Sequence, residues 1–72
     1  MNFILALHTN RSDKSIFYVP LDSIDSYEED PFGGTEIHLH GGHVVFAFES
    51  PEIVTEIIER LKDEKKKWEA KE

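Results

Sequence analysis

The chain has 72 residues, a formal net charge of −7 and no cysteine. A chain of this length forms one small domain, and the missing cysteines exclude disulfides, thiolate nucleophiles and cysteine metal sites. The longest apolar runs, residues 3–7 and 44–48, have five residues each, whereas a spanning helix needs roughly 20. Since the N-terminus also lacks a signal-peptide pattern, we expect a cytoplasmic protein with no membrane insertion.

Three strands are predicted in the first 29 residues. Residues 2–8 are nearly continuous in apolar side chains, which is typical of a strand covered on both faces. Residues 16–21 are β-branched and aromatic, and Pro20 marks an edge or the end of that strand because proline cannot donate to a ladder. Residues 22–29 predict a short turn and a weaker third strand, and residues 30–34 a loop.

A tight hairpin is predicted around Gly41 and Gly42, because a two-residue Gly-Gly loop is typical of such turns. This loop would place His40 opposite His43 and Ile37 opposite Phe46. The register predicts one face that is almost entirely apolar, made of Thr35, Ile37, Leu39, Val44, Phe46 and Phe48. The other face would carry Glu36, His38, His40, His43, Val45 and Ala47.

A C-terminal helix is predicted to begin at the segment Ser50, Pro51 and Glu52, which combines a capping residue, a proline suited to the first turn and an acid suited to the helix dipole. Apolar residues then recur at helical spacing from Ile53 to Leu61. We therefore expect an α+β fold, a small antiparallel sheet of four to five strands with one C-terminal helix packed on it. Residues 1–62 would form the domain and residues 63–72 a charged helix extension, free to fray.

The distribution of charge narrows the class of partner. No lysine or arginine lies between residues 15 and 59, so the folded body lacks the cations that bind phosphates, and we expect no direct nucleic-acid binding. The acids either serve solubility or dock on a protein with a basic surface. Tryptophan is common among interface anchors. The candidate partner-binding residues are Asp22, Asp25, Glu28, Glu29, Asp30 and Trp68.

The histidines offer a second hypothesis. His38, His40 and His43 on one hairpin face would supply three nitrogens to a metal with an open fourth position. The alternative is that they are polar residues on the outer face of an amphipathic hairpin. No catalytic signature is present, so we expect a non-enzyme without a cofactor. Because so short a chain has a small core, self-association to a homo-oligomer is a further alternative.

Residues 20–61 resemble the FlbD/SwrD family of small flagellar and swarming-motility proteins. The similarity lies in Ile24 with Tyr27, in the run from Thr35 to Gly42, and in Phe48-Glu49-Ser50 before the helix. The resemblance implies a role in motility. The leading hypothesis is a non-catalytic regulator or adaptor, bacterial or from a phage, that docks on another protein. The alternatives are metal binding by the hairpin histidines and inhibition of a partner by occupying its basic nucleic-acid-binding surface.

Overall fold

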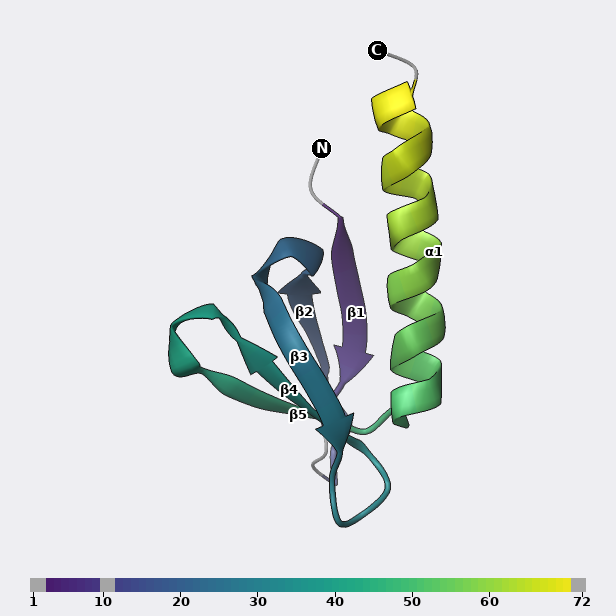
Figure 1. Ribbon diagram of the computed structural model, residues 1–72. Coiled ribbons are helices and arrows are strands. Elements are labelled where there is room, and N and C mark those ends of the chain that lie inside the picture. The colour runs from purple at the N-terminus through teal and green to yellow at the C-terminus, as the bar shows by residue number, and fades with distance from the viewer. Residues whose placement is uncertain (1–2, 10–11, 71–72) are drawn as a thin grey trace.

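The computed structural model describes residues 3–9 and 12–70, which form five strands, two short 3-10 helices and one long helix (Figure 1). In chain order the elements are β1 (Ile4–His8), β2 (Ile16–Pro20), η1 (Leu21–Ser23), β3 (Ile24–Glu29), β4 (Thr35–Leu39), η2 (His40–Gly42), β5 (Val44–Ala47) and α1 (Pro51–Ala70). The predicted α+β class is confirmed.

The strands form two antiparallel sheets, where the sequence predicted one. One sheet is the β1–β2 hairpin, and the other has the order β3-β4-β5. They meet at a corner where Thr9 forms an isolated bridge with Ala47 and the Phe48 N–H donates to the carbonyl of His8 at 2.8 Å. Pairing between β5 and β1 is limited to this corner, so the strands fold around the core as two short sheets.

The core lies between the two sheets and α1. Its buried apolar residues come from both sheets and from one side of the helix: Leu5, Leu7, Val19, Ile37, Ala47, Val54 and Ile58. The helix begins as predicted, and the Ile53 N–H donates to the Ser50 hydroxyl at 3.5 Å. Val54 and Ile58 lie in the core, whereas Ile53, expected in the same stripe, is exposed.

The C-terminal end of α1 extends beyond the strands (Figure 1). The helix continues without interruption to Ala70, and its 20 residues make it about 30 Å long. Between residues 62 and 69 only Lys65 is partly buried, and Trp68 is 52% exposed. Residues 63–70 of the predicted charged extension are therefore helical with an exposed surface, and residues 71 and 72 lie outside the described residues.

The predicted hairpin register is wrong by one residue on β5. Residues 40–42 form a three-residue connection, and the Leu39 N–H donates to the His43 carbonyl at 2.8 Å. His38 therefore faces Val44, and Ile37 faces Val45. Because side chains alternate along a strand, this shift turns Val45 and Ala47 inward and leaves Val44 and Phe46 exposed.

Candidate functional site: a groove between β3 and α1

A groove of about 360 Å³ lies between the segment η1–β3 and the side of α1 that faces it. Its apolar lining is Leu21, Ile24, Tyr27 and Ile58, and its polar lining is Asp22, Asp25, Ser26, Lys62 and Lys65. The helix supplies the lysines, and η1 and β3 supply the carboxylates. The groove thus combines an apolar surface with both signs of charge.

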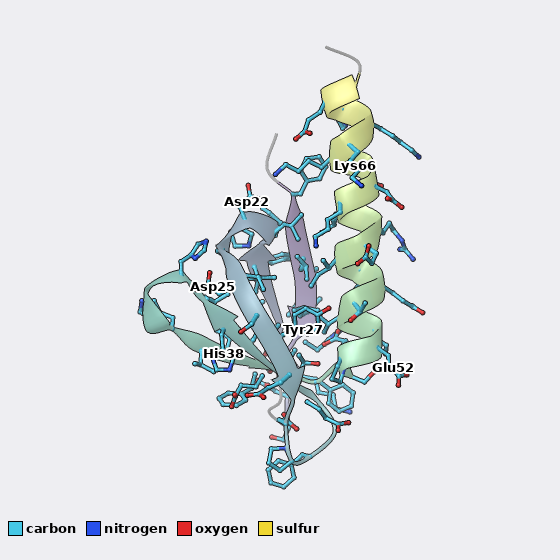
Figure 2. The ribbon with its side chains drawn as sticks, viewed as in Figure 1. Asp22, Asp25, Tyr27, His38, Glu52 and Lys66 are labelled. Carbon is cyan, nitrogen blue, oxygen red and sulfur yellow. The ribbon has the colours of Figure 1, made fainter. Side chains whose placement is uncertain are left out.

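Two contacts hold β3 and η1 to the helix at this groove. The Tyr27 hydroxyl lies 2.7 Å from the Thr55 hydroxyl oxygen, and Figure 2 shows Tyr27 between β3 and α1. Lys65 Nζ lies 3.1 Å from an Asp22 carboxylate oxygen. An exposed ion pair of this kind contributes about 0–1 kcal/mol to stability.

The structure separates the predicted acidic residues by their environment. Asp22 and Asp25 line the groove, and Asp25 lies at an irregularity in the β3–β4 pairing, where its carboxylate bonds to His40 Nδ1. Glu28 and Glu29 are exposed at the far end of β3. These four residues therefore follow one another along η1 and β3.

Asp30 differs from the other acids because it is buried, with 6% of its surface exposed. Its Oδ1 accepts hydrogen bonds from the N–H groups of Phe32, at 2.7 Å, and Gly34, at 3.0 Å. The carboxylate therefore organises the loop between β3 and β4. This role in the loop explains why the Asp30 carboxylate is buried, and the explanation requires no partner protein.

Trp68 lies further along α1 than the groove, whose lining does not include it. It follows Lys65 by three residues, and residues three apart are neighbours on a helix surface. It also continues the stripe of Ile58 and Leu61, which the core covers lower down the helix. Its half-exposed indole thus extends the apolar surface past the ion pair of Lys65 with Asp22.

The structure does not bring the three predicted histidines together as one set of ligands. Among the described residues, the potential ligand atoms that lie within 4.8 Å of one another belong to Glu28, Glu36 and His38. His40 bonds instead to Asp25, and His43 is exposed beyond the η2 turn. Only His38 of the predicted set therefore belongs to a cluster.

The His38 cluster lies on the outer face of the three-stranded sheet. His38 Nε2 is 2.8 Å from Glu36 Oε2 and 3.6 Å from Glu28 Oε1. Glu28 and Glu36 face each other across β3 and β4, and like charges in that position repel. A protonated imidazole or a divalent cation would relieve this repulsion, and two carboxylates with one imidazole are suitable ligands for zinc.

Sequence reasoning missed two features near these residues. One is the exposure of Val44 and Phe46, which the predicted register placed on the apolar face. The other is Glu49, which binds His8 from 41 positions away in the chain. The resemblance did include Glu49 and Ser50, but no local pattern indicates a partner so distant in sequence.

No protein-family model matches the chain, and comparisons with curated proteins and with solved structures find no significant match. The resemblance to the FlbD/SwrD family therefore stays a prediction. Among the described residues, no helix is both long and apolar enough to cross a membrane.

Proposed function

We propose that this protein is a non-catalytic docking module that binds a partner protein in the groove between β3 and α1. The observation that carries the proposal is the groove itself, with an apolar surface bordered by Asp22 on one side and Lys62 on the other. An apolar side chain of the partner would enter the groove, and charged groups beside it would pair at the border. The proposed setting is the cytoplasm.

The charge of the whole chain supports a partner with a basic surface. A net charge of −7 attracts cationic surfaces and accelerates their approach. The exposed carboxylate of Glu29, two residues after Tyr27 and therefore on the same face of β3, continues the acidic side of the groove. Glu28 lies on the opposite face with Glu36, where it adds to the long-range attraction of a basic partner.

A double charge change, on α1 and on η1, tests this proposal. Lys62 lines the groove, whereas Lys67, five residues later, lies on another side of the helix and is also exposed. In capture from a lysate of the source cell, we expect Lys62→Glu combined with Asp22→Asn to lose proteins that the wild type and Lys67→Glu retain. Equal recovery by all three chains would overturn the groove as the docking site.

The acidic segment needs a separate variant, because one of its residues supports the fold. Changing Asp25, Glu28 and Glu29 to their amides leaves the buried Asp30 intact. If the acidic segment attracts a basic partner, we expect this variant to bind the captured partner more slowly than the wild type does. Added salt should reduce the difference between the two association rates. An association rate that neither the amides nor salt change would contradict the basic partner while leaving the groove itself in place.

A second candidate function is metal binding, favoured by the proximity of Glu28, Glu36 and His38. Titration calorimetry with Zn²⁺ tests it on the chain itself. If this cluster binds Zn²⁺, we expect the binding heat to be lost in His38→Asn and retained in His40→Asn and His43→Asn. Equal binding by the His38 variant and the wild type, or no heat with any chain, would exclude the site.

A further inference from the structure

The β1–β2 hairpin carries an unusual outer face. Its inner face is buried in the core, but the outer side chains are all exposed. They form three cross-strand pairs, Ile4 with Pro20, Ala6 with Tyr18, and His8 with Ile16. Three large side chains, Ile4, Ile16 and Tyr18, expose 46%, 54% and 69% of their surface.

Apart from His8, whose ring bonds to the Glu49 carboxylate, the side chains of this outer face are uncharged. No Asp, Glu, Lys or Arg occurs in β1 or β2. Antiparallel strands that face water on one side usually alternate apolar with polar residues, and here the alternation is absent. A contiguous exposed apolar patch on a soluble domain marks an interaction surface.

The net charge of the chain limits which of its faces can contact a second copy. Two copies that each carry a charge of −7 repel, so a contact between them has to keep the carboxylates apart. The outer face of the other sheet fails this condition, because Glu28 and Glu36 lie directly opposite each other there. The hairpin face meets this condition, since its strands hold no carboxylate and the Glu49 carboxylate that bonds to His8 is largely covered. The same negative charge disfavours an anionic lipid surface.

The side-chain sizes on the hairpin match a two-fold contact. In such a contact residue i of one copy meets residue j of the other, and the reverse. The central pair joins the small Ala6 to the large, projecting Tyr18. A two-fold axis parallel to the strands, between β1 and β2, would seat each Tyr18 ring over Ala6 of the other copy, with isoleucines on both sides.

From these observations we infer that the outer face of the β1–β2 hairpin binds a second copy of this chain. The contact covers apolar surface that a 72-residue domain cannot cover by itself. The inference does not depend on the proposed docking function, since the groove is lined by η1, β3 and α1.

Sedimentation of matched variants tests the inference. Tyr18→Lys and Phe46→Lys each replace an exposed strand aromatic by the same charge, but only Tyr18 is on the hairpin. We expect the mass of the wild type and of Phe46→Lys to rise with concentration from 8.3 kDa toward twice that value. The midpoint for Tyr18→Lys should lie at least about tenfold higher in concentration, with an unchanged circular-dichroism spectrum. A wild type that stays monomeric up to millimolar concentration, or a Tyr18 variant that dimerises equally well, would overturn the inference.

Cross-linking tests the geometry, and the chain is suited to it because it has no cysteine. An equimolar mixture of the Ala6→Cys and Tyr18→Cys variants, oxidised with glutathione disulfide, should give the mixed disulfide between positions 6 and 18. A mixture of Ala6→Cys with Phe46→Cys serves as the control and should stay at the background level. Equal yields from the two mixtures would contradict the two-fold contact. The face would then be covered by another protein or left exposed.

Discussion

The carboxylate of Glu49 contacts both the backbone N–H and the ring of His8. The carboxylate accepts from the His8 N–H at 3.0 and 3.2 Å, and its Oε2 lies 2.8 Å from His8 Nδ1. The Phe48 N–H donates to the carbonyl of the same histidine. The end of β1 is thereby attached to the segment that leads into α1, at the corner where the two sheets meet.

This contact makes stability depend on acidity. Burial acts to raise the pKa of Glu49, but hydrogen bonds from His8 outweigh it and hold the pKa below its ordinary value of 4.5. A carboxyl group with a lowered pKa in the folded state stabilises the fold above its ordinary pKa. That contribution is lost as the pH falls through the lower, folded-state value.

The first prediction concerns Glu49→Gln. The amide offers one accepting oxygen where the carboxylate offers two, so we expect a loss of about 1–2 kcal/mol at pH 7 in urea denaturation. The difference from the wild type should shrink as the pH falls through the lowered pKa of Glu49, because the wild-type carboxyl then becomes protonated. Glu59→Gln, an exposed substitution on α1, is the control and should change little. A difference that stays constant from pH 7 down to the acid unfolding of the wild type would contradict this account.

The second prediction separates loop structure from partner binding at Asp30. Asp30→Ala removes the acceptor for the N–H groups of Phe32 and Gly34, so we expect a loss of about 1–3 kcal/mol in the free energy of unfolding. The neighbouring Glu29→Ala, at an exposed position, should change it by less than about 0.5 kcal/mol. Similar values for the two variants in thermal or urea unfolding would show that the loop does not need the carboxylate.

The third prediction concerns Gly34, which is required for space. A Cβ added there would lie 2.3 Å from the carbonyl oxygen of Ala47, which is backbone and has little freedom to move. Gly34→Ala should therefore cost about 3 kcal/mol. Gly42→Ala meets no atom within 4 Å but has a positive φ of 83°, so it should cost only about 1 kcal/mol. Chemical denaturation of both variants checks the order, and a larger loss at Gly42 would reverse the explanation.

The fourth prediction tests the contact at the lower end of the groove. Tyr27→Phe and Thr55→Val each remove one hydroxyl of the 2.7 Å pair. A double-mutant cycle should give a coupling of about 1 kcal/mol between them. Additive losses in the cycle would mean that the hydroxyl groups do not stabilise the packing of β3 on α1.

Part of the candidate site was predictable from sequence. Asp22 and Asp25 were selected because they lie in a run without lysine or arginine, and both line the groove. Asp30 was selected for the same reason, yet its carboxylate serves the backbone of its own loop. Composition identifies acids in a segment, but it does not distinguish one that faces solvent from one that accepts nearby N–H groups.

The histidine hypothesis depended on the hairpin register in the same way. A two-residue turn and a three-residue connection are both compatible with Gly41 and Gly42. The structure places Ala47 in the corner beside Thr9 and buries it. This contact between distant residues accompanies the register that turns Phe46 outward and places His38 opposite Val44.

By itself the sequence determined the features that arise from neighbouring residues: the α+β class, the start of α1 at Ser50 and Pro51, and the burial of Val54 and Ile58 on one helix face. Helix caps and periodic apolar spacing act over a few positions, so a local pattern is enough to specify them. Only the tertiary structure decided the division into two sheets, the register of β5, the groove and the exposed hairpin face. These features depend on contacts between segments far apart in the chain, such as His8 with Glu49, which no local pattern encodes.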